Sequence, residues 1–214
     1  MKHSSPTGPV SGVVLAGGQS SRLGRDKSLL EIEGQPLLAR TVRILAKFSD
    51  DLLVVTNTPE RYAPLALPVR FVADEQPGVG SLMGVYSGLK AARSPRALVV
   101  ACDMPFLNPA LLDYLISLAG EYDVVIPRLG GLPEPLHAVY SRACLPAMEK
   151  VLRQGKRQII AFFDQVRVRW VEERELAPLD PRRLSFLNIN TPQDWARVQA
   201  ILRADHPSVR SCRL

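Results

Sequence analysis

Short apolar runs alternate with helical patterns along the first half of the chain. Four such runs are present, at Gly12–Ala16, Asp51–Thr56, Val69–Ala73 and Ala97–Cys102. Their residues are apolar on both faces, which is typical of strands in a parallel sheet that helices cover on both sides. Helical patterns are found at Pro36–Phe48, Ser81–Ala92 and Pro109–Leu118. The alternation predicts a three-layer, Rossmann-like α/β fold with a mostly parallel central sheet.

The second half of the chain carries weaker patterns. We expect a strand at Pro135–Tyr140, a helix at Cys144–Gln154 and a half-exposed strand at Val166–Val171. The segment Thr191–Asp194 has the cap, the proline and the acid that begin a helix, which then runs to about Ala204. A length of 214 residues suits one domain. We place that domain at residues 11–204, between flexible tails at 1–10 and 205–214.

Composition excludes several classes of protein. With 46% hydrophobic and 22% charged residues, the chain has a globular composition, and no apolar run approaches the roughly 20 residues of a membrane-spanning helix. Three cysteines without close spacing predict neither a disulfide framework nor a zinc site. The N-terminus has no apolar stretch of the secretion-signal type, so we expect a cytoplasmic protein without a membrane partner. A net charge of +6 suits an anionic ligand, but no nucleic-acid recognition motif is present, and we expect no nucleic-acid partner.

The loop Gly17–Lys27, directly after the first apolar run, is the strongest functional signal. It reads Gly-Gly-Gln-Ser-Ser-Arg-Leu-Gly-Arg-Asp-Lys. Glycines allow successive backbone N–H groups to surround phosphate oxygens, and the two arginines and the lysine add positive charge. The Walker spacing is absent because the lysine comes three residues after the last glycine, and the dinucleotide fingerprint is absent because the first two glycines are adjacent. The alternative is an ordinary strand-to-helix loop with a solvated basic rim.

The segment Leu15–Lys27 resembles the L-A-G-G-x-S-x-R-M-G-x-D-K signature of the molybdenum cofactor guanylyltransferases, the MobA family. Asp74 heads a glycine-rich segment at residues 77–84, as in that family. Further matches occur in the family's order, with G-x-P-L at Gly34–Leu37, C-D-x-P at Cys102–Pro105 and N-x-N-T-P at Asn188–Pro192. The resemblance covers nearly the whole chain.

The resemblance implies a nucleotidyltransferase fold and a defined activity. The family transfers GMP from GTP to Mo-molybdopterin and releases pyrophosphate, so GTP and Mo-molybdopterin are the implied substrates. Proteins that insert molybdenum and proteins that mature molybdoenzymes are implied partners. The alternatives are a related transferase that uses CTP or another phosphate acceptor, and a non-catalytic nucleotide-binding protein. A binding module has no need of a pair such as Lys27 and Asp103, which disfavours the second alternative.

The implied catalytic residues are Lys27, Arg22 and Asp103. The acceptor is an ionised phosphate, so the reaction requires positioning and charge neutralisation at the α-phosphorus rather than a strong base. Lys27 and Arg22 supply positive charge for the phosphates. Asp103 follows a buried strand, and its carboxylate is the expected ligand of Mg²⁺, the implied cofactor. The alternative for Asp103 is a cap on the helix after Pro105.

The implied nucleotide-binding residues are Leu15, Ala16, Gly17, Gly18, Lys27, Asn57, Asp74 and Asp103. Gly17 is implied to affect which nucleotide base is accepted. Related cytidylyltransferases have alanine at this position, and glycine leaves room for a purine such as guanine. Asn57 follows the second predicted strand and matches a family asparagine that contacts the base or the ribose. Asp74 follows the third strand and matches a nucleotide-contact position. The alternative for Asp74 is a loop acid that bonds its own backbone.

The implied pterin-binding residues are Asn188 and Asn190, whose neutral amides can pair with a pterin without repelling its phosphate. The alternative for Asn190 is support of the helix cap at Thr191. His137 is interpreted as a satisfied core residue rather than a catalyst. A basic run is interpreted as a solvated helix face, with attraction of the anionic pterin as the alternative; it comprises Lys150, Arg153, Lys156 and Arg157.

Overall fold

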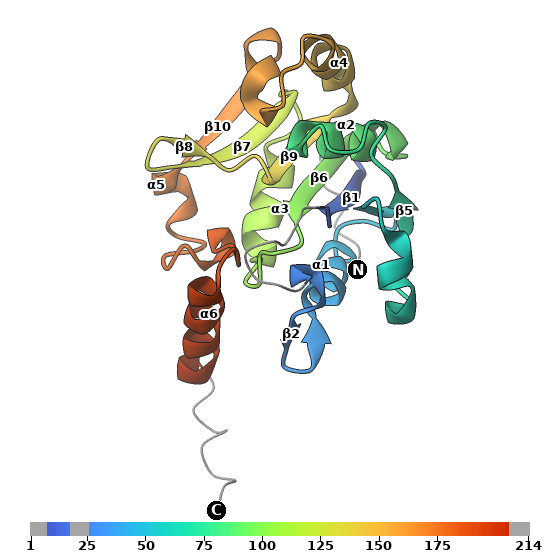
Figure 1. Ribbon diagram of the computed structural model, residues 1–214. Helices are drawn as coiled ribbons and strands as arrows, with labels where there is room; N and C mark the ends of the chain where they lie inside the picture. The colour runs from blue at the N-terminus through green and yellow to red at the C-terminus, as the bar shows by residue number, and fades with distance from the viewer. Residues whose placement is uncertain (1–7, 18–25, 206–214) are drawn as a thin grey trace, which may run out of the picture.

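A mixed β-sheet lies between two layers of helices in the computed structural model, which describes residues 8–17 and 26–205 (Figure 1). The strands are β1 (Val10–Leu15), β2 (Glu31–Ile32), β3 (Gln35–Pro36), β4 (Leu52–Val55), β5 (Arg70–Val72), β6 (Arg96–Ala101), β7 (Val124–Leu129), β8 (Leu132–Pro133), β9 (His137–Ser141) and β10 (Val168–Glu172). The α-helices are α1 (Leu37–Leu45), α2 (Ser81–Ala91), α3 (Pro109–Ser117), α4 (Leu145–Arg153), α5 (Glu173–Leu176) and α6 (Pro192–Asp205). The short 3-10 helices are η1 (Lys27–Leu29), η2 (Pro59–Leu65), η3 (Arg142–Cys144), η4 (Ile159–Gln165) and η5 (Leu184–Phe186).

The large sheet has the strand order β10-β7-β9-β6-β1-β4-β5, with β8 paired to β7. β1 is parallel to both β4 and β6, and β4 is parallel to β5. β9 runs antiparallel to its two neighbours, β6 and β7. The predicted α/β fold with a mostly parallel central sheet is confirmed. Because β1, β4, β5 and β6 are parallel, their carboxyl ends share one edge, where ligands bind in open α/β sheets.

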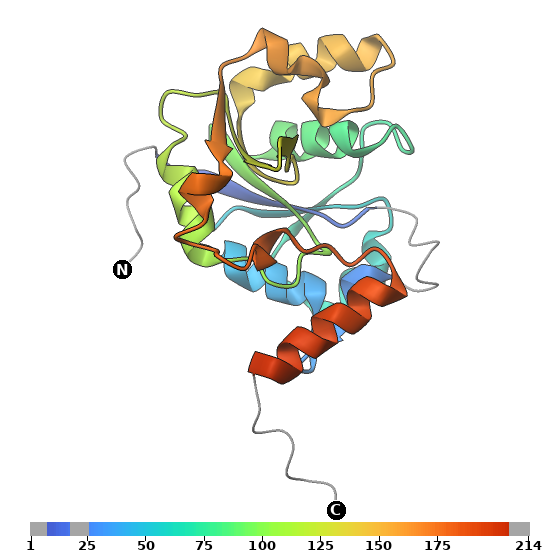
Figure 2. The same cartoon turned by 90° about the vertical axis from the view of Figure 1, so that its left-hand side faces the viewer.

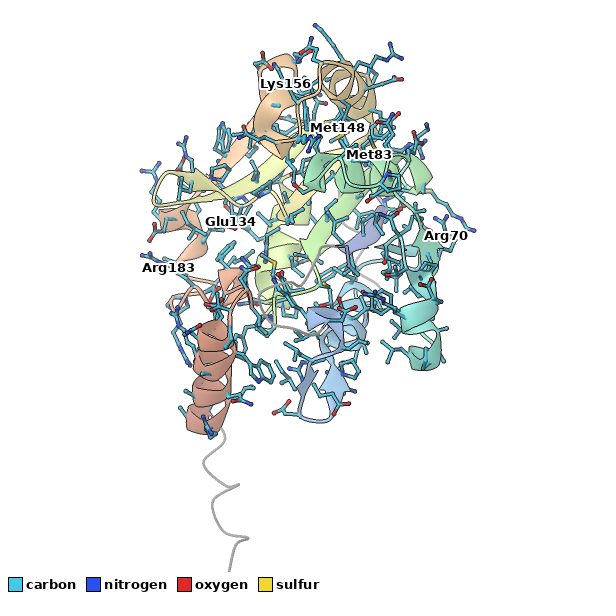
Figure 3. The ribbon with its side chains drawn as sticks, in the orientation of Figure 1. Arg70, Met83, Glu134, Met148, Lys156 and Arg183 are labelled. Carbon is cyan, nitrogen blue, oxygen red and sulfur yellow. The ribbon has the colours of Figure 1, made fainter. Side chains whose placement is uncertain are left out.

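Helices cover both faces of the sheet, as Figure 2 shows with α2 and α4 above it and α1 and α3 below. Alternate side chains of β1 enter different cores: Val13 packs on the α2 side and Val14 on the α1 side. On the upper side, Met83 of α2 and Met148 of α4 lie close together (Figure 3). Burial on both faces explains why these strands are apolar throughout rather than alternating.

Several local expectations require correction. β7 and the β2–β3 hairpin were not predicted, because only three apolar residues precede Pro127 and the hairpin strands have two residues each. Pro36 belongs to β3 rather than to the following helix, which ends at Leu45 instead of Phe48. β1 begins at Val10, a buried residue inside the expected tail. Within residues 8–17 and 26–205, no helix is long and apolar enough to cross a membrane.

Candidate functional site

Lys27 and Asp103 meet at the carboxyl edge of the sheet. Asp103 follows β6, and Lys27 begins η1, the next described element after β1. β1 and β6 are adjacent parallel strands, so their ends deliver both residues to the same place. The Nζ atom of Lys27 lies 3.4 Å from Oδ2 of Asp103, and the two side chains are 18% and 19% exposed. Both side chains are therefore mostly buried, and a small part of each remains accessible to solvent.

The surroundings of Asp103 suit a hard cation bound together with an anionic ligand. Burial raises the pKa of the Asp103 carboxyl, and the nearby Lys27 ammonium opposes that rise. In the described part of the chain, no three His, Cys, Asp or Glu side chains lie close enough together to hold a metal ion. A cation here would rest on one carboxylate and on oxygens of its ligand, an arrangement that Mg²⁺ adopts with phosphates. The single carboxylate of Asp103 is compatible with the implied Mg²⁺, which stays a prediction.

Asn190 joins this pair from the far end of the sequence. Its Oδ1 accepts a hydrogen bond of 2.7 Å from Nζ of Lys27. The backbone N–H of Ile189 donates to the carbonyl oxygen of Asp103 at 3.0 Å, which fixes this segment against the end of β6. Asn188 is not part of the same contacts, since its Nδ2 donates to the carbonyl of Phe186 at 3.4 Å. Of the two implied pterin residues, only Asn190 reaches Lys27.

The segment around Asn190 also forms the predicted beginning of α6. The Thr191 Oγ1 accepts from the backbone N–H of Asp194 at 3.1 Å, and Asp194 Oδ2 accepts from the backbone N–H groups of Thr191 and Asn190 at 2.8 and 2.9 Å. This reciprocal cap confirms the helix start predicted from the sequence. Asn190 therefore supports the cap with its backbone and contacts Lys27 with its side chain.

Asn57 and Asp74 form a second pair at the same edge, after β4 and β5. Asn57 Nδ2 donates to Asp74 Oδ2 at 3.0 Å, and the Asp74 N–H donates to Asn57 Oδ1 at 2.9 Å. The other carboxylate oxygen, Oδ1, is buried and has no hydrogen-bond partner among the described residues. A Cβ on Gly84 would lie 3.5 Å from this oxygen and 3.4 Å from Cδ1 of Leu15. The end of β1, Asp74 and the first turn of α2 thus converge.

At the described end of β1, backbone groups rather than side chains are available for contact with a ligand. Leu15 and Ala16 are buried, and the Ala16 N–H donates to the carbonyl of Val55 at 3.0 Å. Gly17 is exposed, and among the described residues a Cβ placed on it would meet only the Val55 carbonyl oxygen, at 4.0 Å. The packing of the described residues therefore does not require glycine at this position. Gly18 and Arg22 lie outside the described residues, so their predicted roles stay predictions.

Comparison with known proteins gives the family. The model of the MobA-like NTP transferase domain matches residues 12–169. A probable molybdenum cofactor guanylyltransferase of Pelotomaculum thermopropionicum is 38% identical over 190 residues, covering 89% of this chain and 92% of that protein. The molybdenum cofactor guanylyltransferase of Desulfosudis oleivorans is 36% identical over 197 residues, covering 91% and 96%. The chain belongs to the molybdenum cofactor guanylyltransferase family.

A solved structure agrees with this assignment. The crystal structure of molybdopterin-guanine dinucleotide biosynthesis protein A from Archaeoglobus fulgidus superposes with a TM-score of 0.79 at 28% identity, covering 91% of this chain and all of that one. This guanylyltransferase-family member is therefore a nucleotidyltransferase, and its fold is that of the family.

Tyr62 is a residue of this family member that sequence reasoning missed. It lies in η2 and is only 2% exposed. Its Oη is 3.2 Å from the carbonyl oxygen of Ala16 and 3.1 Å from Oδ2 of Asp26, so it contacts the residues on both sides of the glycine-rich loop. No motif marks it, because its contacts are with residues more than 30 positions away in the sequence.

His137 lies in the core but is not satisfied there, which corrects its interpretation. The side chain is fully buried, and neither ring nitrogen has a hydrogen-bond partner in the described part of the protein. Its ring packs against Phe186 with centroids 4.8 Å apart. Burial lowers the pKa of His137 to about 4, although the charge of Asp180 acts in the opposite direction. His137 is therefore neutral at physiological pH.

The basic run is exposed, as expected for a solvated face. Arg153 pairs with Glu149 one turn earlier on α4, at 2.7 Å, and Lys156 projects at the outer end of the α4 layer (Figure 3). Only Arg157 approaches the nucleotide loops, since a Cβ on Gly80 would lie 3.6 Å from its Cβ. The run as a whole does not line the Lys27–Asp103 pair.

Proposed function

We propose that this protein transfers GMP from GTP to Mo-molybdopterin with Mg²⁺ as cofactor, forming the guanine dinucleotide and releasing pyrophosphate. The observation that carries the proposal is the pair of Lys27 and Asp103, 3.4 Å apart at the carboxyl edge of the parallel strands. The family relationship supports both substrates, because the relatives are named for guanylyl transfer to the molybdenum cofactor.

We assign the nucleotide and the acceptor to different sides of that pair. The nucleotide would bind along the ends of β1, β4 and β5, against the backbone from Leu15 to Gly18, Asn57 and Asp74. Asp74 Oδ1 supports this placement, because it is buried without a partner among the described residues and can accept hydrogen bonds from a base or a ribose. The acceptor would bind on the side of Asn188 and Asn190, and the 2.7 Å hydrogen bond from Lys27 to Asn190 supports this assignment.

The proposed reaction needs no proton transfer. An ionised oxygen of the acceptor's terminal phosphate forms a bond to the α-phosphorus of GTP. The bond from that phosphorus to the bridging oxygen breaks, and its electron pair leaves with pyrophosphate. Lys27, together with Arg22, offsets the negative charge that develops on the leaving group. Asp103 would hold a bound Mg²⁺, which would supply further charge neutralisation on the phosphates.

We place this activity in the cytoplasm and expect its protein partners to be those that insert molybdenum or mature molybdoenzymes. The two described cysteines, Cys102 and Cys144, are both free, which agrees with a reducing compartment.

The test is direct incubation of the purified protein with Mo-molybdopterin, GTP and Mg²⁺. We expect guanine dinucleotide and an equal amount of pyrophosphate, with little product when CTP replaces GTP. A Lys27→Ala preparation purified in the same way controls for contaminating activity. Product from CTP alone would indicate the cytidylyl-transferring alternative. GTP binding without any product would indicate the non-catalytic alternative.

A further inference from the structure

A chain of buried polar side chains runs beneath the Lys27–Asp103 pair. Tyr62 Oη lies 3.2 Å from the Ala16 carbonyl and 3.1 Å from Asp26 Oδ2. The hydroxyl of Ser28 is 3.4 Å from the same Tyr62 oxygen and 3.1 Å from Sγ of Cys102. Tyr62, Ser28 and Cys102 are 2%, 3% and 9% exposed. The contacts therefore connect η2, η1 and the end of β6 inside the core.

Apart from Tyr62, the members of this network are immediate sequence neighbours of the catalytic pair. Asp26 and Ser28 flank Lys27, and Cys102 directly precedes Asp103. The Ser28 N–H donates to Asp26 Oδ1 at 3.0 Å, which closes the backbone turn around Lys27. The side chains below the backbone therefore join the same two segments whose outer side chains meet at 3.4 Å.

The hydrogens in the chain can be assigned without conflict. Tyr62 has one hydrogen to donate to Asp26 or to the Ala16 carbonyl, and its oxygen can then accept from Ser28. The Ser28 oxygen can in turn accept from the Cys102 thiol. Burial raises the pKa of Tyr62 to about 12, so its hydroxyl remains protonated. Each donor thus has an acceptor, and a fully satisfied buried network favours one arrangement of the groups around it.

We propose that Tyr62, Ser28 and Cys102 are positioning residues that hold Lys27 opposite Asp103. None of the three is proposed to touch a substrate; they act through the backbone on either side of the pair. The inference rests on the proposed function for its catalytic consequence. Its geometric content, that Tyr62 and Cys102 order the two segments, can be measured without any substrate.

The first test is Tyr62→Phe, which removes the hydroxyl and keeps the ring and its stacking on Phe71, with centroids 6.3 Å apart. Displacement of Lys27 by less than an ångström should lower kcat by about tenfold. The KM for GTP should change less, and circular dichroism should show a folded protein. Tyr114→Phe is the matched control. The Tyr114 hydroxyl donates to Glu175 at 3.2 Å and is not among the contacts of Tyr62, Ser28 and Cys102. Its kcat should be that of the wild type.

The second test separates hydrogen bonding from packing at Cys102. Cys102→Ser keeps a donor and an acceptor, whereas Cys102→Ala keeps neither. If hydrogen bonding by Cys102 positions Asp103, the serine variant retains kcat and the alanine variant loses it. If Cys102 is only a small buried hydrophobe, the serine variant is at least as impaired as the alanine variant, and the proposal is wrong for this residue.

The third test uses amide hydrogen exchange in the absence of substrates. In Tyr62→Phe, peptides that cover residues 26–30 and 101–104 should exchange several-fold faster than in the wild type and in Tyr114→Phe. Wild-type kcat together with wild-type exchange in Tyr62→Phe would overturn the proposal. A wild-type protein that forms no dinucleotide would instead overturn the proposed function. The exchange rates would then be the test of whether Tyr62 orders the two segments.

Discussion

Tyr62 and His137, two buried polar residues on opposite flanks of β6, differ in whether they have hydrogen-bond partners among the described residues. On the β1 side, Tyr62 and Ser28 have partners within the protein, and Lys27 is paired with Asp103. On the β9 side, both ring nitrogens of His137 and the hydroxyl of Ser185 are buried without a partner among the described residues. Buried polar groups with partners fix geometry, whereas those without partners reduce stability. We therefore expect substitutions of Tyr62, Ser28 or Lys27 to change catalysis and substitution of His137 to change stability.

The largest effect is expected at Asp103. In Asp103→Ala and in Asp103→Asn, turnover should fall below detection in a folded protein, because neither side chain carries the charge that holds a hard cation. Asp113→Asn, at an exposed position of α3, is the control and should keep wild-type activity. Near wild-type turnover with Mg²⁺ in Asp103→Asn would show that Asp103 does not take part in the mechanism. The expectation that substitutions beside β1 change catalysis would then lose its main support.

Lys27 should show the next largest effect. Removing a cation aimed at developing charge lowers the rate by at least ~10²-fold, so Lys27→Ala should lose this much in kcat with a smaller rise in the KM for GTP. Lys27→Arg should restore little, because the single Nζ contacts both Asp103 and Asn190, at 3.4 and 2.7 Å, and a planar guanidinium has a different geometry. Steady-state kinetics distinguish a catalytic role of Lys27 from a role in GTP binding alone. An increased KM with unchanged kcat would show that Lys27 only binds GTP.

The pairs that were predictable from the sequence share one property. Asp103, Asn57 and Asp74 each follow a strand of the parallel set by two residues, Lys27 comes at the end of the loop after β1, and the carboxyl ends of such strands meet at one edge. Their proximity follows from the fold class alone. The identity of the partners does not, since nothing in the local pattern specifies that Asn190 rather than Asn188 reaches Lys27.

The features that were not predictable depend on distant contacts. Tyr62 has no helical or strand pattern around it, and its function in the network comes from residues on two other segments. β7 has only three apolar residues before Pro127, and its pairing with β9, β10 and β8 makes it a strand. The missing partners of His137 are equally invisible in sequence, because a buried histidine with and without a hydrogen bond has the same apolar neighbours along the chain.

His137 predicts a loss of stability in mild acid. Its pKa is lowered to about 4 in the folded protein, against about 6.5 in the unfolded chain. Below pH 6.5 the unfolded chain binds a proton that the folded protein does not, so stability falls as the pH drops from 6.5 towards 4. Between pH 7 and pH 5 this residue should account for about 2 kcal/mol of lost unfolding free energy.

The measurement is urea unfolding of the wild type and of His137→Leu at both pH values. The variant should lack this part of the pH dependence and should be no less stable than the wild type at pH 5, since it removes two unsatisfied nitrogens. Catalytic constants at pH 7 should change less than in Lys27→Ala. Equal pH dependence in the two proteins would mean that His137 is protonated or hydrogen-bonded in the fold, and the contrast between the two flanks of β6 would disappear.

Gly17→Ala should give the smallest effect, and it tests whether glycine at the end of β1 serves the ligand or the fold. In the part of the chain that the structure describes, a Cβ on Gly17 would meet only the Val55 carbonyl oxygen at 4.0 Å, so the melting temperature should not change. If the added methyl group occupies space that a purine needs, the affinity for GTP should fall on the order of tenfold, about 1.4 kcal/mol, while that for CTP changes less.

For Gly88→Ala we expect the opposite result, a lower melting temperature, because its Cβ would lie 2.6 Å from Cγ1 of Val13 and must disturb the core. Calorimetric titration with both nucleotides and thermal melting of both variants separate the two cases. An unchanged GTP affinity in Gly17→Ala would show that the base is selected elsewhere, and the unpartnered Asp74 oxygen would then be the next position to test.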